Sequence, residues 1–247
     1  MGKFAHDTVV PDLESNLSKK EQVALMFDRI AFRYDFLNRF LSAGIDVYWR
    51  KKALSKLQST QPKYILDVAT GTADVAILAS ELLSPQKIIG IDISEGMLEI
   101  GRKKIKSRQL ENTIELRTGD SEDIMLDSNE LDAVTVAFGV RNFQNLEKGL
   151  AEILRVLQPN GKLVVLEFSK PTLPVIKELY WFYMNAITPL FGKLFSSNKK
   201  AYEYLNRSVQ KFPEGKEFES ILALVGYKNI TRQPLSLGIC TIYTGEK

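Results

Sequence analysis

The sequence predicts an α/β fold with a mostly parallel sheet of seven strands, whose last strand runs antiparallel to the others. Three observations support this prediction. Apolar runs typical of buried strands alternate with helical patterns over residues 63–168, as in a parallel sheet with helices on both faces. The first strand ends in a short turn and the second ends in an acid, Asp92, which is the layout of a nucleotide-binding βαβ unit. Finally, β-like runs at residues 228–232 and 238–244 predict a terminal hairpin.

A helical N-terminal segment, residues 1–58, is expected before the first strand. Residues 1–17 are typical of a loose leader, in which we expect His6 to be solvated. From Lys19 onward, apolar residues recur at spacings of three and four, as in an amphipathic helix. The pattern breaks before Asp46, which we expect to be the N-cap of a second helix.

The rest of the chain alternates regularly, and we expect residues 1–247 to form one domain. Asn160 and Gly161 favour a tight turn into the fifth strand. The expected strands cover residues 63–67, 87–92, 113–118, 131–137 and 161–168. The expected helices cover residues 74–83, 95–108, 145–157, 199–211 and 215–225.

The strict alternation stops at residues 171–212, which predict a helical insertion or lid. Within it, residues 173–195 are aromatic and weakly charged. Two interpretations stay open for this stretch: a core helix packed on the sheet, or an apolar cover that touches a lipid substrate or a membrane surface. On the second interpretation, nearby cations would assist contact with an anionic membrane, namely Lys193, Lys199 and Lys200.

Composition excludes several classes of protein. The net charge is +3, from 33 basic and 30 acidic residues, which is too small to predict a nucleic-acid partner. The single cysteine, Cys240, excludes an internal disulfide and a thiolate metal site. The single histidine excludes His-based metal sites and Ser-His-Asp chemistry, so we expect no metal ion. With no apolar signal core and no run of 18 apolar residues, the chain is expected to be cytoplasmic.

The turn after the first strand predicts the kind of cofactor. A dinucleotide site uses the glycine-rich pattern G-x-G-x-x-G, which lets a helix N-terminus approach a pyrophosphate. Here residues 69–73 contain one glycine, Gly71, and Asp67 precedes them on the strand. An acid at that position suits a cationic ligand, whereas Asp92 can accept hydrogen bonds from ribose hydroxyls. S-adenosylmethionine carries a ribose, an ammonium and a sulfonium but no phosphate, and it fits this pattern.

Longer motifs make the prediction more specific. Asp120 and Ser121 follow the third strand, where either could meet an adenine amino group. The fourth strand runs into Phe-Gly-Val-Arg-Asn-Phe at residues 138–143, at the edge where such sheets bind ligands. With further blocks at residues 26–38, 41–50 and 166–171, the sequence over residues 19–245 resembles the ubiquinone/menaquinone biosynthesis methyltransferases. These are Rossmann-like class I enzymes that use S-adenosyl-L-methionine to C-methylate polyprenylated quinol precursors.

The resemblance implies the cofactor contacts. It assigns Thr72, Asp92, Asp120 and Ser121 to S-adenosylmethionine, and we add Asp67 and Gly71 of the first turn. Three positions depart from the family pattern. Asp120 stands where some members carry asparagine, and either side chain can accept a hydrogen bond from an adenine amino group. Ala73 replaces a frequent second glycine, which a tight turn tolerates if its φ is negative. Ala137 replaces a serine found in some members and offers only backbone atoms.

The implied mechanism needs a ring carbon made nucleophilic by ionisation of the adjacent hydroxyl. Arg141 and Asn142 are the candidates that stabilise the phenolate-like ring, since arginine stays charged at any working pH. Without a usable histidine, the base would be a carboxylate, a tyrosine or water, and Tyr34, Asp35 and Asp46 are the candidates. Structural alternatives remain open: Arg141 could pair with a carboxylate at the sheet edge, and Tyr34 and Asp35 could anchor the N-terminal helix.

For the reaction, the resemblance implies methylation of demethylmenaquinol, a polyprenyl naphthoquinol, to menaquinol. The alternatives are a polyprenyl benzoquinol in ubiquinone synthesis, another small acceptor, a non-catalytic scaffold, and a nicotinamide dehydrogenase. Because polyprenyl quinols reside in bilayers, we expect peripheral contact with the inner face of the cell membrane. The sequence leaves the oligomeric state open, with a homodimer as one option.

Overall fold

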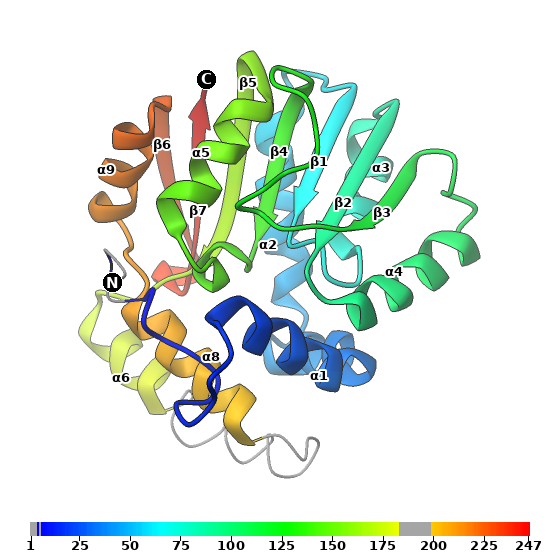
Figure 1. The fold of residues 1–247 in the computed structure, drawn as a ribbon. Coiled ribbons are helices and arrows are strands. Elements are labelled where there is room, and N and C mark those ends of the chain that lie inside the picture. The colour runs from blue at the N-terminus through cyan, green and yellow to red at the C-terminus, as the bar shows by residue number, and fades with distance from the viewer. Residues whose placement is uncertain (1–3, 5, 183–198) are drawn as a thin grey trace.

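The computed structural model describes residues 4, 6–182 and 199–247, which form a seven-stranded sheet between helical layers (Figure 1). The strand order is β3-β2-β1-β4-β5-β7-β6. β7 pairs antiparallel with both of its neighbours, and the other pairings are parallel. The predicted mostly parallel sheet with an antiparallel last strand is therefore confirmed. The strands are β1 (Tyr64–Val68), β2 (Lys87–Asp92), β3 (Ile114–Thr118), β4 (Leu131–Ala137), β5 (Leu157–Phe168), β6 (Lys228–Leu235) and β7 (Cys240–Glu246).

Helices cover both faces of the sheet, because successive side chains of each buried strand point to opposite sides. In β5, Leu163 and Val165 pack with α5 and α9, whereas Val164 and Leu166 pack with α2 and α3. Each fully buried aliphatic side chain of this kind contributes roughly 1.5–3 kcal/mol. The covering helices are α2 (Ile45–Leu54), α3 (Asp74–Leu83), α4 (Glu95–Ser107), α5 (Leu146–Val156) and α9 (Lys216–Val225).

A third group of helices lies across the carboxyl ends of the parallel strands (Figure 1). It consists of α1 (Lys19–Leu41), α6 (Pro174–Phe182) and α8 (Lys199–Lys211). α1 begins with a capping box, in which the Ser18 side chain and the Glu21 side chain each bind the other residue's backbone N–H. The strand order reverses between β1 and β4, and this switch point is where sheets of this kind bind ligands. The three helices therefore close over the expected site.

The expected helix and strand boundaries are close to those observed, with two corrections. β5 begins at Leu157 rather than at residue 161, because Leu157 already pairs with Leu131 before a register shift. Asn160 still adopts the left-handed backbone of a tight turn, at φ 66°. Asp46 is not the N-cap of α2. Gly44 holds that position at φ 78°, while Asp46 lies inside the helix and binds the Arg50 side chain one turn later.

The expectation of a solvated His6 in a loose leader is wrong. The His6 side chain is fully buried, and its ring lies 6.1 Å from that of Phe4 and 5.8 Å from that of Phe212, between ring centroids. Lys19 Nζ donates hydrogen bonds to the backbone carbonyls of His6 at 2.9 Å and Arg141 at 3.4 Å. These contacts tie the leader to the loop after β4. Burial, followed by the charge of Lys19, lowers the pKa of His6 to about 3.

The aromatic stretch predicted at residues 173–195 is described only in part. α6 covers its first half, and residues 183–198, which include Lys193, lie outside the described residues. The choice between a core helix and an apolar cover therefore stays a prediction. In the part of the chain that the structure describes, no helix is both long enough and apolar enough to cross a membrane.

Candidate functional site

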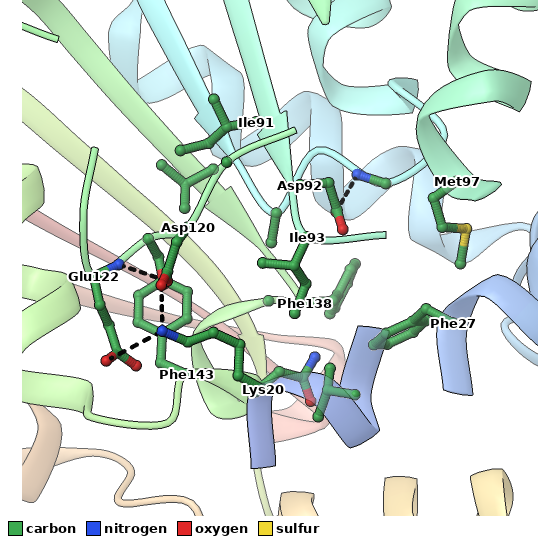
Figure 2. Close-up of a pocket in the computed structure, with 18 of the residues that line it drawn as sticks. Lys20, Phe27, Ile91, Asp92, Ile93, Met97, Asp120, Glu122, Phe138 and Phe143 are labelled. Atoms are coloured by element: carbon green, nitrogen blue, oxygen red, sulfur yellow. Dashed lines mark hydrogen bonds and ion pairs between the residues drawn. The ribbon is translucent and has the colours of Figure 1, made fainter. Parts of the chain in front are cut away.

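A small cavity of about 70 Å³ lies between the carboxyl ends of β1, β2 and β4 and helix α1 (Figure 2). Asp92 enters it from the tip of β2, where its carboxylate accepts hydrogen bonds from the backbone N–H groups of Gly71 at 2.8 Å and Ser94 at 2.9 Å. Burial raises the pKa of Asp92 to about 6. The side chain is thus held in one orientation, with lone pairs left to receive donors from a ligand.

The turn after β1 is left-handed at alternate residues. Ala69, Gly71 and Ala73 have φ values of 54°, 57° and 65°. The negative φ that would make Ala73 easy to accommodate is therefore not adopted, and the alanine carries backbone strain of roughly 1–2 kcal/mol. Gly139 packs against this turn, since a Cβ added to it would lie 2.5 Å from the Cβ of Ala69. The glycine at position 139 is thus needed for the turn to fit.

Asp67 and Thr72 are not among the described residues that line this cavity. The two carboxylate oxygens of Asp67 accept hydrogen bonds from the hydroxyls of Thr70 and Thr135, each at 2.6 Å, which fastens the turn to β4. Burial raises the pKa of Asp67 to about 6.

Thr72 meets the predicted catalytic candidate Asp35. Its hydroxyl donates to Asp35 Oδ1 at 2.5 Å and accepts from Lys104 Nζ at 3.0 Å. Lys104 Nζ also lies 2.9 Å from Asp35 Oδ2, and Asp35 is not among the described residues that line this cavity. This cluster joins α1 to α4, which is the anchoring arrangement considered above for Asp35.

Asp120 and Ser121 line the small cavity as their position after β3 suggested. Asp120 accepts a hydrogen bond from the backbone N–H of Glu122 at 2.9 Å and pairs with the ammonium of Lys20, whose side chain extends from α1 towards Asp120 (Figure 2). Lys20 also lies 3.7 Å from Glu122 Oε2. Sequence reasoning missed Lys20, because helical periodicity alone does not show which strand end a helix crosses.

A larger cavity of about 510 Å³ adjoins the small one, between α1, α2, α6, α8 and the sheet edge. Phe27, Tyr34 and Phe138 line both cavities and therefore form the partition between them. Phe138 adopts φ 58°, an unusual backbone for a bulky residue, and its ring packs on that of Phe168 at 4.6 Å. The remaining wall is mostly apolar and includes Met26, Ile30, Trp49, Leu205 and Val209.

Four of the five candidates named for the reaction line one or both cavities. Tyr34 lines both, Asp46 lines the larger one, and Asp35 is not among the described residues that line either. Arg141 lines the larger cavity and is buried, with Nη1 2.7 Å from Glu167 Oε1. Asn142 lines the smaller cavity, and its Oδ1 accepts a hydrogen bond from Tyr204 at 3.0 Å. Burial raises the pKa of the Tyr34 phenol above its usual value. The ion pair of Arg141 with a sheet carboxylate, considered above as an alternative role, is thus present.

Known proteins share both the sequence and the fold. The chain is 44% identical to the demethylmenaquinone methyltransferase of Bacteroides fragilis, over 93% of this chain and 94% of that protein. It is 45% identical to the ubiquinone/menaquinone biosynthesis C-methyltransferase UbiE of Geotalea daltonii, over 93% and 97% of the two chains. The structure of a SAM-dependent methyltransferase from Thermotoga maritima matches with a TM-score of 0.61 at 17% identity, over 90% of this chain and 99% of that one, and shows the same fold. Residues 15–247 match the model of the ubiE/COQ5 methyltransferase family, so the chain belongs to that family.

Proposed function

We propose that this protein is an S-adenosylmethionine-dependent C-methyltransferase that converts demethylmenaquinol to menaquinol. The observation that carries the proposal is the pair of adjoining cavities: one holds the acid at the tip of β2, and the other is large and apolar. Among the described residues, three aromatic side chains line both cavities, namely Phe27, Tyr34 and Phe138, so a methyl donor and an apolar acceptor can meet there. The names of the relatives from Bacteroides fragilis and Geotalea daltonii support a quinol as the acceptor.

The small cavity offers groups that fit S-adenosylmethionine. Asp92 would accept hydrogen bonds from the ribose hydroxyls, and Asp120 or Ser121 would meet the adenine amino group. Ile93, Met97 and Phe143 supply apolar walls for the adenine ring. Gly71 brings the backbone close to the ligand. When bound, S-adenosylmethionine supplies a methyl group made electrophilic by its sulfonium.

The larger cavity fits a naphthoquinol with the first part of its prenyl chain. Its volume of about 510 Å³ lies within the range of roughly 300–1,000 Å³ that small-molecule sites occupy. Its mostly apolar wall would bury the rings and the chain and keep water away from the reacting atoms. A benzoquinol would also fit and is the alternative acceptor, in ubiquinone synthesis.

In the reaction, the carbon beside a ring hydroxyl attacks the methyl group in line. The hydroxyl would lose its proton to a water molecule, a carbon–carbon bond would form, and the sulfur–carbon bond would break with its electron pair going to sulfur. Loss of the ring proton then restores the aromatic ring. Arg141 and Asn142 would stabilise the ionised ring oxygen by donating hydrogen bonds. Tyr34, whose pKa is raised by burial, would donate rather than abstract a proton at neutral pH.

Peripheral membrane contact is part of this proposal, since the acceptor carries a long apolar chain. Apolar side chains are exposed on the helices that enclose the larger cavity: Phe32 of α1 is 91% exposed and Val175 of α6 is 69% exposed. Basic side chains beside Phe32 on α1, among them Arg29, would favour an anionic surface. Replacing Phe32 and Val175 with serine should weaken liposome binding, and unchanged binding would contradict this contact.

The function is tested by calorimetry with S-adenosylmethionine, followed by assays with short-chain demethylmenaquinol and the corresponding benzoquinol. We expect the cofactor to bind and the naphthoquinol to gain one methyl group by mass spectrometry. Methylation of the benzoquinol alone would favour the alternative acceptor. Cofactor binding without methylation of either would contradict the proposal and favour a scaffold. In cells, loss of the protein should cause demethylmenaquinone to accumulate.

A further inference from the structure

Arg50 is an arginine on the wall of the larger cavity, and part of its guanidinium has no acceptor in the protein. The residue is 7% exposed and lines the cavity together with its partner Asp46. Nη1 donates to Asp46 Oδ2 and lies 3.7 Å from Asp74 Oδ2. Among the described residues, no acceptor meets Nε or Nη2, yet neither atom is one of the fully buried side-chain atoms that lack a partner. These two nitrogens therefore keep accessible surface.

Asp46 holds this guanidinium in place. Its Oδ1 accepts hydrogen bonds from the Ser42 hydroxyl at 2.8 Å and from Arg39 Nη1 at 3.3 Å, and its Oδ2 accepts from Arg50. Arg50 Cζ also lies 5.8 Å from the ring centroid of Phe138, which is within the range of a cation–π interaction. Arg50 is thus bound along one edge and packed on one face, so its remaining N–H groups are directed donors.

The contact with Phe138 places Arg50 beside the proposed reaction, because Phe138 lines both cavities. The Phe138 ring packs on that of Phe168, with centroids 4.6 Å apart. Arg141 lines the same cavity, and its Cζ lies 5.5 Å from the ring centroid of Phe168. Two arginines therefore lie against two packed rings at the point where the cavities adjoin.

The acceptor itself carries two oxygens. A 1,4-quinol has one ring oxygen beside the attacking carbon, for which Arg141 is the donor in the proposed function. Its second ring oxygen lies on the opposite side of the ring. In a mostly apolar cavity this oxygen also needs a donor, because a buried polar atom without a partner is costly. Arg50 has donors that no described residue uses.

We propose that Arg50 donates a hydrogen bond to the second ring oxygen of the quinol, opposite the oxygen assigned to Arg141. Arginine has only donors, so this subsite accepts an oxygen and gains nothing from a bare ring carbon. Arg50 is then a specificity-determining residue that favours a 1,4-quinol over a simple phenol. This inference rests on the proposed function and adds a substrate-binding residue to it.

Arg39 provides a matched control on the same carboxylate. It also pairs with Asp46, but its side chain is 48% exposed and it is not among the described residues that line the larger cavity. Arg39→Met and Arg50→Met each take one cation from Asp46, and only the second takes a donor from the cavity. Comparing the two variants therefore separates direct contact from a change of charge near Asp46.

The experiment measures the binding of two probes, 4-methoxy-1-naphthol and 4-ethyl-1-naphthol, to the full chain by calorimetry. The probes are similar in shape, and a CH₂ group in the ethyl probe replaces the ring oxygen opposite the hydroxyl in the methoxy probe. The ratio of the ethyl Kd to the methoxy Kd therefore reports on that oxygen. We expect this ratio to fall about tenfold in Arg50→Met, the effect of losing one hydrogen bond from a charged donor. In Arg39→Met it should stay within about twofold of the wild-type value.

Arg50→Lys carries the test if Arg50→Met does not fold, since methionine leaves the buried Asp46 without its nearest cation. Lysine keeps a charge beside Asp46 but has one nitrogen in place of the planar fork. We expect this variant to fold and its probe ratio to fall at least about threefold. The Kd of S-adenosylmethionine should stay at the wild-type value, because Arg50 is not among the described residues that line the smaller cavity.

A wild-type probe ratio in the folded Arg50 variants would overturn the proposal, as would an equal fall in Arg39→Met or no binding of either probe. Weaker binding of S-adenosylmethionine with an unchanged probe ratio would also overturn it and assign Arg50 to the methyl donor. A fall confined to the Arg50 variants, in a protein that methylates no quinol, would support the subsite while the proposed function fails. Methylation of the naphthoquinol with an unchanged probe ratio would have the opposite meaning.

Discussion

Arg141 and Glu167 form a buried ion pair across neighbouring strands, with Nη1 of the arginine 2.7 Å from Oε1 of the glutamate. Glu167 lies in β5, and Arg141 follows β4, which pairs with β5 in parallel. Taking both charges out of water is costly, and each compensates the other only while both are present. Arg141 therefore faces the larger cavity as a fixed hydrogen-bond donor whose charge is largely balanced.

Glu167→Gln should destabilise the fold by about 3 kcal/mol, because it leaves the guanidinium of Arg141 buried without a counter-charge. Urea unfolding measures the change. Glu246→Gln is the control, since Glu246 pairs with Lys162 at 3.1 Å in a more exposed position and should contribute less than about 1 kcal/mol. Equal losses in the two variants would contradict a special role for the buried pair.

Arg141→Lys and Arg141→Ala should both lower kcat by about 100-fold or more, the usual effect of removing one donor to a developing oxyanion. Lysine keeps the charge but lacks the planar guanidinium, so it should not restore turnover. The affinity for S-adenosylmethionine, measured by calorimetry, should change little because Arg141 lines the other cavity. Full turnover in both variants with unchanged affinity would refute phenolate stabilisation by Arg141.

Gly139→Ala should disturb the cofactor turn, because the added Cβ would lie 2.5 Å from the Cβ of Ala69. We expect a loss of roughly 1–3 kcal/mol in stability together with weaker binding of S-adenosylmethionine. Ala69→Gly removes the opposing atom and relieves the left-handed alanine at φ 54°. The double variant should therefore recover most of the affinity. No recovery would mean that the two positions do not interact through this contact.

The sequence predicted what periodicity and strand ends determine. The strands and helices follow from regular alternation, and Asp92, Asp120 and Asn142 line one cavity because parallel strands end at one edge. Periodicity does not show which way a turn residue faces, so the partners of Thr72 were not predicted. It also gives no signal for a single histidine buried by residues that are distant in sequence.

Periodicity also does not predict the roles of the two tyrosines that line the larger cavity. Tyr180 and Tyr204 belong to helices α6 and α8, whose placement over the sheet edge depends on tertiary packing. Their aromatic surroundings fit a core helix as well as a cavity wall. Nothing in the sequence distinguishes a tyrosine hydroxyl that has a partner from one that does not.

Thr72→Val should loosen α1 rather than remove a cofactor contact, since the Thr72 hydroxyl bridges Asp35 and Lys104. We expect a loss of about 1 kcal/mol in stability, the usual value for a hydrogen bond, and faster amide exchange in α1. The Kd of S-adenosylmethionine should change less in Thr72→Val than it does in Asp92→Asn. A large loss of affinity with unaltered exchange in α1 would instead restore Thr72 as a direct cofactor contact.

Acidification should release the leader that contains His6. The pKa of His6 is lowered from 6.5 to about 3, so the neutral ring is buried while the free segment protonates. The free energy that holds the leader on the protein is therefore largest above about pH 6.5. It falls by about 1.4 kcal/mol for each pH unit below that value. Exchange at the amides of Val9 and Asp12, corrected for the intrinsic rate, should therefore accelerate from about pH 7 to about pH 5.5. His6→Leu should abolish this dependence, and an equal acceleration in that variant would refute the role of His6.

The affinity for S-adenosylmethionine should also fall as the pH is lowered, because the Asp92 carboxylate becomes protonated. Burial raises the pKa of this carboxyl from 3.8 to about 6, and the ionised form is the better acceptor for ribose hydroxyls. We expect a constant Kd above about pH 7 and an increase approaching tenfold per pH unit below about pH 6. Calorimetry over this range measures it.

The variant Asp92→Asn should bind S-adenosylmethionine weakly at every pH, and its Kd should no longer depend on pH. Asp67→Asn is the matched control: the pKa of Asp67 is also raised to about 6, but its oxygens bind Thr70 and Thr135 outside the cavity. In Asp67→Asn, the Kd of S-adenosylmethionine should therefore depend on pH as it does in the wild type. Because the folded-state pKa of Asp92 is the higher one, its protonation stabilises the fold, and this stabilisation is lost as pH rises through about 6. Protonation of Asp92 therefore weakens the binding of S-adenosylmethionine without unfolding the protein. If the Kd still rose with acid in Asp92→Asn, the pH dependence would belong to another group.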